Sequence, residues 1–354
     1  MGRRNGKADP DAGAASERPG PRMAAGIEDV ARQAGVSIST VSRVLNGIAS
    51  RASQETAERV RLAAAVLGYR PAQTGRALRT NRTRLVGLLI PDMTNAFYAA
   101  IAQSIESSLV EGDYAMILCN TGEDPAAQDA YLAEMRAHRV RGIALLGAVA
   151  SPGLQAAGEY QTPIVYVNRK APDGGGIFVG IDNYGAGRAV ADHFVDQGYR
   201  DCAALHGPAH SPASRERFAG YRDRLAERDC AMPAGRAIET RLTMEDGYRA
   251  SADLFAQGRP PRALFCGNDQ IAYGTFRRCR ELGLRVPQDV AVFGFDDNPL
   301  NDWLAPWLST VHVPYGEFGP AVKQALERLW AVPGGVAPTA EILLPYSIKL
   351  RESG

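Results

Sequence analysis

The chain has 354 residues, of which 45% are hydrophobic and 22% are charged, and its formal net charge at pH 7 is +1. These values are ordinary for globular proteins, and the length allows two or three compact units with cores of their own. No run of about 18 consecutive apolar residues occurs, which argues against a membrane-spanning helix.

The charge is divided unevenly along the chain. Residues 1–84 hold 15 Arg or Lys and 7 Asp or Glu side chains, whereas residues 85–354 hold 25 and 32. A basic head on an acidic body indicates a polyanionic partner for the head alone. Residues 1–25 are rich in Gly, Ala, Pro and charge and lack an apolar segment, so we expect a disordered tail rather than a secretory signal.

Three short helical patterns fill residues 27–69. The first ends at Gly35, because glycine tolerates the left-handed conformation that stops a helix. Ser37 and Ser53 stand where they can cap the second and third helices. Apolar residues recur at helical spacing and define the inward faces: Ile27, Val30, Ala31, Ala34, Val41, Val44, Leu45, Ala57, Val60, Ala64 and Leu67.

The first two helices and the tight glycine-containing turn between them have the shape of a helix-turn-helix that reads DNA. Ile38 and Ser39 would point outward at the start of the second helix. Arg43 follows one turn later, where it can donate two hydrogen bonds to guanine O6 and N7. The alternative is a small helical bundle with a solvated arginine. The remaining candidates are small hydroxyls that suit phosphates or bases: Ser37, Thr40 and Ser42.

Residues 71–84 form a basic linker with one large apolar side chain, Leu78. A short helix can begin at Pro71. A nine-residue helix over 71–79 is shorter than the roughly 12–15 residues that an isolated helix needs, and Gly75 weakens it further. We therefore expect a segment that is coil in the free protein, with a plain flexible linker as the alternative.

From residue 85 onward, short apolar runs recur between amphipathic helical stretches. Such alternation is typical of parallel sheets that are covered on both faces, with ligands bound outside the carboxyl ends of the strands. About 270 residues exceed one usual domain, so we expect two α/β lobes. The expected strands are 85–90, 114–119, 142–147, 163–167, 177–181, 263–266 and 290–295, and the expected helices are 97–111, 125–138, 185–198, 214–228, 245–257 and 269–283.

Several other chemistries find no support in the motifs. The five cysteines form no CxxC pair and no metal-ligand spacing with histidine, so we expect buried, reduced thiols and no metal. The segment GAGRAV at 185–190 lacks the third glycine or alanine of a dinucleotide fingerprint, and its glycines suit close helix packing. No Ser/His/Asp or Cys/His set stands out, so we expect neither catalysis nor a cofactor.

Three stretches resemble the LacI/GalR family of bacterial transcriptional repressors: IEDVARQAGVSISTVSRVLNG, ETAERVRLAAAVLGYRP and LVGLLIPDMTNAFY. The resemblance covers about residues 26–354 and includes GNDQIAYG at 267–274 and VFGFDD at 292–297. It implies a small all-α helix-turn-helix head, a hinge helix and a two-lobed α/β effector domain with parallel sheets, like the periplasmic sugar-binding proteins. It also implies a homodimer that binds palindromic double-stranded operator DNA under the control of a small-molecule effector.

The resemblance also assigns residues to DNA. In this family pattern Leu78 inserts into the minor groove at the centre of the operator, where the cost of unstacking bases is offset by contacts to the bent duplex. The hinge would fold on DNA as a pair in the dimer. The expected DNA-binding residues are Ser37, Ile38, Ser39, Thr40, Ser42, Arg43, Asn46, Arg76, Ala77, Leu78 and Arg79.

An effector cleft between the lobes follows from the same resemblance. Arg217 suits a ligand oxygen or carboxylate, and Asp296, at the carboxyl end of a strand, can accept two sugar hydroxyls. These residues favour a sugar or a sugar acid. For each position the alternative is a structural cap or ion pair, and for the aromatics a place in the core. The expected effector-binding residues are Phe97, Tyr98, Asn168, Arg169, Arg217, Asn268 and Asp296.

The expected organisation has four segments: a disordered tail at 1–25, a helix-turn-helix domain at 26–70, a hinge at 71–84 and an effector-binding and dimerisation domain at 85–354. Within the last segment, lobe one takes about 85–182 and 315–340, and lobe two takes about 183–314 and 341–354.

Three features depart from the family pattern. Gly26 stands where the family usually has Thr or Ser, so a helix cap and a phosphate contact are in doubt. The loop at 47–52 is one residue longer than usual. Met23 stands where such a chain usually begins, so we expect it to be the initiator.

The sequence therefore predicts a cytoplasmic transcriptional regulator, a repressor controlled by a small effector, and not an enzyme. The alternative is a cytosolic sugar-binding receptor or sugar-acting enzyme built on the same α/β lobes. The basic head argues against both alternatives, and the missing export signal argues against an exported receptor.

Overall fold

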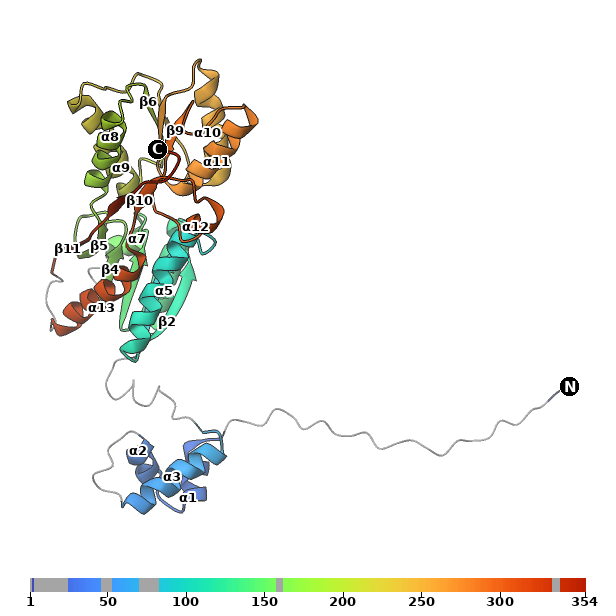
Figure 1. Cartoon of the computed structure of the whole chain (residues 1–354). Helices are drawn as coiled ribbons and strands as arrows, with labels where there is room; N and C mark the ends of the chain where they lie inside the picture. Colours follow the sequence, from blue (N-terminus) through green and yellow to red (C-terminus); the bar gives the residue numbers. More distant parts are fainter. Residues whose placement is uncertain (1, 3–24, 46–52, 70–82, 157–161, 333–337) are drawn as a thin grey trace. The chain divides into compact units, whose positions relative to one another are not determined.

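The structure is a computed structural model of the whole chain. It describes residues 2, 25–45, 53–69, 83–156, 162–332 and 338–354. The chain divides into two compact units, Met1–Asn81 and Arg82–Gly354, which we call the head and the core (Figure 1).

The head is built from three short helices around one small apolar cluster. Val30, Val41 and Val60 come from successive helices and are fully buried in it. Gly35, at φ 64°, ends the first helix in the left-handed conformation expected from the sequence. The helices are α1 (Ile27–Ala34), α2 (Ile38–Leu45) and α3 (Gln54–Val66), in agreement with the three predicted patterns.

The caps of the head helices follow from their polar residues. The Oγ atom of Ser37 accepts a hydrogen bond from Thr40 N at 3.3 Å, and that of Ser53 accepts one from Thr56 N at 3.3 Å. Gly26 has no side chain to offer, and instead its N–H donates to Asp29 Oδ2 at 2.9 Å. The start of α1 is therefore fixed by a carboxylate from within the helix.

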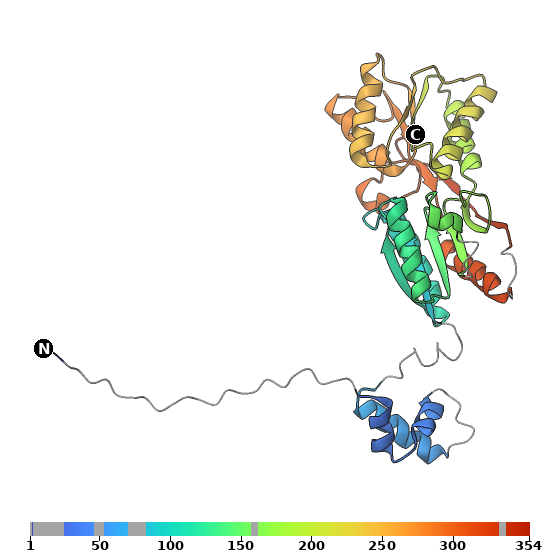
Figure 2. The same ribbon diagram turned by 180° about the vertical axis from the view of Figure 1, so that it is seen from behind.

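Lobe one of the core is a six-stranded, fully parallel sheet. Helices α5 (Ala96–Glu111) and α13 (Tyr315–Ala331) cover one face, while α6 (Pro125–Ala137) and α7 (Pro152–Gln155) cover the other (Figures 1 and 2). In sheet order the strands are β11 (Ala340–Leu344), β5 (Ile177–Ile181), β4 (Ile164–Val167), β3 (Gly142–Leu146), β1 (Leu85–Ile90) and β2 (Ala115–Asn120).

Lobe two is a smaller parallel sheet with two helices on each face. In sheet order its strands are β7 (Ala237–Glu239), β6 (Cys202–His206), β8 (Ala263–Cys266) and β9 (Ala291–Phe293). Its helices are α8 (Asn183–Asp196) and α9 (Pro212–Glu227) on one face, and α10 (Met244–Ala256) and α11 (Asp269–Glu281) on the other.

Two further strands and a short helix complete the core. Strands β10 (Thr310–His312) and β12 (Ser347–Lys349) pair antiparallel, and α12 (Asn301–Leu304) lies between β9 and β10 along the chain. The two-lobed α/β architecture with parallel sheets confirms the fold class expected from the sequence. No helix in the described ranges is long and apolar enough to cross a membrane.

One predicted boundary is wrong. Strand β11 pairs with β5 along its whole length, from Ala340 opposite Ile177 to Leu344 opposite Ile181. The strand therefore belongs to the sheet of lobe one, although the sequence placed residues from 341 onward in lobe two. A parallel edge strand is held by a distant partner, and nothing local in its sequence names that partner.

The structure also bears on the predictions for the GAGRAV glycines and for the five cysteines. Gly187, from the GAGRAV segment, lies inside α8, where an added Cβ would stand 2.0 Å from the Arg217 carbonyl oxygen of α9. The glycine thus permits the close helix packing that the sequence suggested. All five cysteines are unpaired, and four are buried as expected, whereas Cys119 is only half-buried.

Candidate functional site

The outward face of α2 carries the predicted DNA-reading side chains. Val41 and Val44 are buried against the other head helices, which turns Ile38, Ser39 and Arg43 outward. Ile38 is 47% exposed. The face is therefore a compact surface of one apolar, one hydroxyl and one cationic side chain, which suits entry into a groove.

Hydrogen bonds within α2 order this face. Arg43 Nε donates to the Ser39 carbonyl oxygen at 3.0 Å, and Nη2 lies 3.4 Å from Ser39 Oγ. The Ser37 hydroxyl is 2.9 Å from the hydroxyls of both Ser39 and Thr40. Thr40 and Ser42 are half-buried, so they offer less surface to a partner than Ser39 does.

The other predicted DNA contacts fall outside the described residues. These are Asn46 and the four hinge positions Arg76, Ala77, Leu78 and Arg79. The expectations for the longer 47–52 loop and for Met23 as the initiator also fall outside the described residues.

In the core, one cleft gathers all seven predicted effector-binding residues. It is lined from lobe one by residues at the carboxyl ends of β1 and β4, and from lobe two by residues near the starts of α9 and α11. The lining residues are Asn95, Phe97, Tyr98, Asn168, Arg169, Ser211, Ala213, Ser214, Arg217, Leu242, Asn268 and Asp296.

The aromatic part of the lining comes from the first turn of α5. Asn95 caps this helix by accepting a hydrogen bond from Phe97 N at 3.0 Å. The rings of Phe97 and Tyr98 meet edge to face, with centroids 5.1 Å apart, and both residues are buried. Burial raises the pKa of Tyr98 to about 12, so its phenol keeps its proton at neutral pH.

Arg169 forms the cationic part of the lobe-one wall. It follows β4, and its guanidinium makes an ion pair with Glu123, which follows β2. Burial acts to lower the pKa of Arg169, but Tyr98 and Glu123 outweigh burial and raise the pKa above its usual value. The neighbouring Asn168 adopts a positive φ of 64°, which sets its side chain at the end of the strand.

Arg217 dominates the lobe-two wall. Its Nε and Nη2 donate to Asn183 Oδ1 at 3.3 and 3.0 Å, its Nη1 donates to the Gly267 carbonyl oxygen, and its guanidinium lies 3.3 Å from the ring centroid of Phe295. Asp296 Oδ1 is 3.7 Å from Nη1. Arg217 thus links the start of α8, the segment after β8 and the segment after β9.

Asp296 sits at the end of the β9 segment, with φ 111°. Burial raises its pKa well above the usual carboxyl range, and Arg217 opposes this effect. Burial likewise lowers the pKa of Arg217, and Asp296 opposes it. A carboxylate beside a fixed guanidinium can accept hydrogen bonds from ligand hydroxyls.

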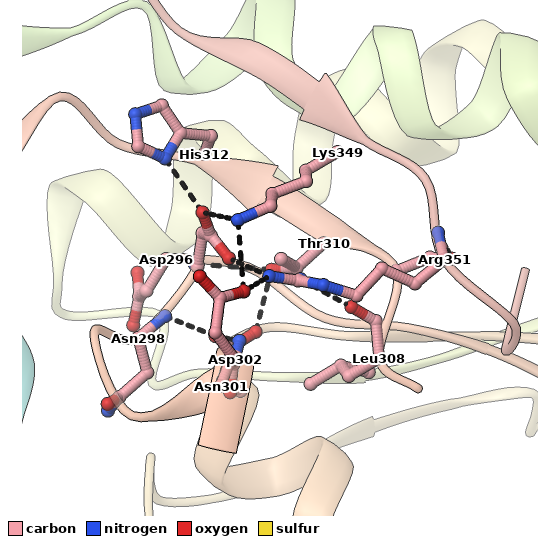
Figure 3. A network of polar contacts seen from close by, with 12 residues as sticks. Asp296, Asn298, Asn301, Asp302, Leu308, Thr310, His312, Lys349 and Arg351 are labelled. Carbon is pink, nitrogen blue, oxygen red and sulfur yellow. Dashed lines mark hydrogen bonds and ion pairs between the residues drawn. The ribbon is translucent and has the colours of Figure 1, made fainter. Parts of the chain in front are cut away.

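A polar network lies beside the loop that carries Asp296 (Figure 3). Asp269 is buried and accepts hydrogen bonds from Thr310 Oγ1 at 2.6 Å and from Asn298 N and Asn301 Nδ2 at 2.7 Å each. Burial raises the pKa of Asp269 to about 6. The loop after β9 is therefore tied to α11, β10 and α12.

Asn268 lines the cleft but is committed to structure. Its Oδ1 accepts from Ile271 N at 2.9 Å, which caps α11, and its Nδ2 donates to the Leu242 carbonyl oxygen at 3.2 Å. These contacts match the structural cap that was the alternative reading of this residue.

Five lining residues were missed by the sequence interpretation: Asn95, Ser211, Ala213, Ser214 and Leu242. Ser214 stands one helical turn before Arg217 in α9, so spacing alone placed it on the same face. Asn95 carried a helix-capping signal two residues before Phe97. Ser211, Ala213 and Leu242 carried no signal that separates them from ordinary loop and helix residues.

Comparison with known proteins bears on both units. The family described as "Bacterial regulatory proteins, lacI family" matches residues 26–72, and "Periplasmic binding protein-like domain" matches residues 191–354. The HTH-type transcriptional repressor PurR of Vibrio campbellii is 34% identical over 306 residues, covering 86% of this chain and 91% of that protein. The ribose operon repressor of Escherichia coli K12 is 33% identical over 295 residues, covering 83% and 89%.

Solved structures agree with the fold. The lac repressor dimer bound to operator and the anti-inducer ONPF aligns with a TM-score of 0.84 at 25% identity, covering 94% of this chain and 99% of that one. The complex of the transcriptional regulator CelR with cellobiose aligns with a TM-score of 0.69 at 29% identity, covering 93% and 100%.

Proposed function

This chain belongs to the lacI family of bacterial regulatory proteins, and we propose that it represses transcription as a homodimer whose affinity for a palindromic operator is set by a small effector. One observation carries the proposal: a helix-turn-helix head with exposed side chains on its second helix and a cleft lined by polar and aromatic side chains occur in the same chain. In this proposal the head recognises the operator sequence, and effector binding to the core controls whether the head binds it.

Each head would read one half-site in the major groove. Ile38 and Ser39 approach the base edges at the start of α2, and Arg43 reaches a guanine one turn later. The two-fold symmetry of a homodimer calls for a palindromic operator. Since Gly26 has no hydroxyl, the start of α1 can offer a phosphate only its backbone.

The hinge at 71–79 would couple the heads to the core. We propose that it folds only on DNA, with Leu78 of each protomer at the operator centre, because it is too short to be stable alone. An effector that alters how the lobes close would alter the separation of the two hinges. Such coupling is reciprocal: an effector that weakens operator binding binds less well to the DNA-bound protein.

The relatives support effector control in general terms. A ribose operon repressor and a cellobiose-bound regulator are among the similar proteins, which supports a sugar as the ligand class. We propose a cytoplasmic location and no catalytic activity, in keeping with the regulators that the chain resembles. A sugar-binding receptor or sugar-acting enzyme on the same lobes leaves the helix-turn-helix head without a role.

The test is selection of DNA fragments bound by the full-length chain from a random pool. We expect enrichment of a palindromic sequence, and affinity for it that falls steeply as salt rises, because phosphate contacts release counterions. Enrichment of no sequence, together with salt-independent binding, would overturn the proposal.

A further inference from the structure

We propose that the cleft selects an uncharged polyhydroxylated ligand, and that the Glu123–Arg169 ion pair is the element that rejects acidic ligands. The inference rests on the proposed function in taking this cleft as the effector site. It narrows the sequence-based choice between a sugar and a sugar acid.

The ion pair crosses the carboxyl edge of the lobe-one sheet. Arg169 follows β4 and Glu123 follows β2, and strands β3 and β1 lie between them in the sheet order. At the end of β3 stands Gly147, where an added Cβ would be 4.0 Å from Arg169 Nε. The arginine side chain therefore passes over a glycine on its way along the sheet edge.

The pair neutralises the only cation on the lobe-one wall of the described cleft lining. The Arg169 side chain is 3% exposed, whereas that of Glu123 is 37% exposed. A guanidinium this deeply buried without a carboxylate would be a strong anion site, since Arg stays protonated in proteins. The Glu123 carboxylate pairs with the Arg169 guanidinium from the more exposed side, so it takes the place that a ligand anion would occupy.

The second arginine of the lining is also committed. Arg217 donates to Asn183 and to the Gly267 carbonyl oxygen, and Asp296 lies 3.7 Å away. A ligand carboxylate that approached Arg217 would meet a guanidinium whose Nε, Nη1 and Nη2 atoms already donate to acceptors within the protein.

The polar side chains of the cleft lining that make no hydrogen bond within the described part of the protein are of the kinds that bind ligand hydroxyls. The structure gives no intramolecular hydrogen bond to the side chains of Ser211, Ser214 and Asn168 within its described ranges, and all three line the cleft. With the Asp296 carboxylate, these groups offer both donors and acceptors to a ring of hydroxyls.

The aromatic lining does not favour a flat heterocycle. Phe97 and Tyr98 are both buried, packed edge to face, and the ring face of Phe295 is covered by Arg217 at 3.3 Å. A stacked base needs an open ring face.

Matched sugar pairs test the selectivity in the full-length protein. The probes are D-ribose with D-ribonate, D-glucose with D-gluconate and D-glucuronate, and D-galactose with D-galacturonate, measured by isothermal titration at constant ionic strength. We expect at least one neutral sugar to bind about tenfold or more tighter than its acid. Equal or tighter binding of the acids, or binding of no neutral sugar, overturns the inference.

Glu123→Gln tests the role of the ion pair. The variant leaves Arg169 buried without its carboxylate, so the acids should gain about tenfold or more in affinity while the neutral sugars gain none. Glu123→Asp keeps the charge and should keep the neutral preference, which separates charge from loss of folding. An unchanged acid affinity in a folded Glu123→Gln protein contradicts the role.

Glu341→Gln is the matched control. Glu341 pairs at 2.7 Å with Lys170, the residue next to Arg169, but Glu341 is exposed, Lys170 is half-buried, and neither lines the cleft. Its removal should leave all sugar affinities unchanged. Operator binding, measured on the same preparations, separates the two proposals: a protein that selects neutral sugars but no DNA sequence retains this inference and loses the proposed function.

Discussion

Arg43 is the longest donor on the outward face of α2, and the helix itself holds it in place. Its contacts to the carbonyl and hydroxyl oxygens of Ser39 keep the guanidinium against the helix surface rather than free in solvent. Such a side chain loses less conformational freedom on binding than an unrestrained one. This restraint supports a reading role over that of a solvated arginine.

Arg43→Ala should therefore weaken binding to the selected operator by about 1–3 kcal/mol per half-site, because a bidentate contact to guanine is lost. Fluorescence anisotropy with operator and random duplexes measures both affinities. Arg61→Ala, at an exposed position of α3, is the control and should leave the ratio of the two affinities unchanged. An intact ratio in the Arg43 variant would contradict its role.

Asp269 is one residue whose ionisation links stability to pH. Burial raises its pKa in the folded protein to about 6, above the value of about 3.9 that it has when unfolded. The folded state therefore binds the proton more tightly, so this contribution to stability is complete below about pH 4 and is lost as pH rises to about 6.

Asp269→Asn should remove that dependence. The amide can still accept from Asn298 and Asn301 and donate to the Thr310 hydroxyl, so the network persists without a charge. Urea unfolding at several pH values measures the difference between wild type and variant, which should change by about 3 kcal/mol between pH 4 and pH 6 and stay flat above. A difference that is constant over this window would refute the assignment.

At the scale of elements, β12 fastens the loop after β9 to α12. Arg351, just beyond β12, donates to Asp297 Oδ1 at 2.9 Å, to Asp302 Oδ1 at 2.7 Å and to the Leu308 carbonyl oxygen at 2.8 Å, while Lys349 lies 3.3 Å from Asp297 (Figure 3). The Asp297 pKa is lowered: burial acts to raise it, but His312, Arg351 and Lys349 outweigh burial. The end of the chain thus neutralises a carboxylate next to the cleft residue Asp296.

Arg351→Ala should destabilise the core by about 2–3 kcal/mol, since it leaves Asp297 short of a charged donor in a buried site. Chemical denaturation of the full chain provides the measurement. The matched control is Arg249→Ala, which breaks an exposed pair with Glu245 in α10 and should cost less than about 0.5 kcal/mol. Equal effects of the two variants would show that the Arg351 contacts are ordinary surface pairs.

The helices and strands differ in how well the sequence predicts them. Helices α5, α6, α8, α9, α10 and α11 and the continuous apolar strands were predicted correctly, because period and burial are written locally in the sequence. Helix α13 (Tyr315–Ala331) was not predicted. Strands β6, β7, β10 and β12 were missed, since none carries a continuous run of large apolar residues and each is fixed by partners far along the chain. The misplacement of β11 has the same cause.

The residues of the cleft, too, could be predicted only where the signal lies in local sequence. The strand-end rule and the family motifs brought seven residues to one place, because those residues lie in recognisable segments. The partner of Arg169 could not be predicted in this way. Glu123 reaches it only because β2 and β4 share one sheet edge, and that proximity is a property of the topology.

At the scale of the whole molecule, the chain separates reading from sensing. The head and the core are distinct compact units, and the candidate DNA contacts described in α2 share no residue with the cleft. Changes confined to one unit should therefore leave the intrinsic binding of the other unit intact, while still affecting how the two are coupled.

Arg217→Ala should accordingly lose effector binding and keep operator binding, whereas Arg43→Ala should lose operator affinity and keep effector binding. Without Arg217, the carboxylate of Asp296 loses its ion pair and Asn183 its donors, so the sugar should no longer bind or alter operator affinity. The operator should still bind, because no head residue has changed. Without Arg43, sugar binding by isothermal titration should match wild type while operator affinity falls. Circular dichroism and thermal melting establish that both variants fold. If Arg217→Ala weakens the operator as much as Arg43→Ala does, the two units are not separable, and the cleft acts on DNA binding through the stability of the chain rather than through a bound effector.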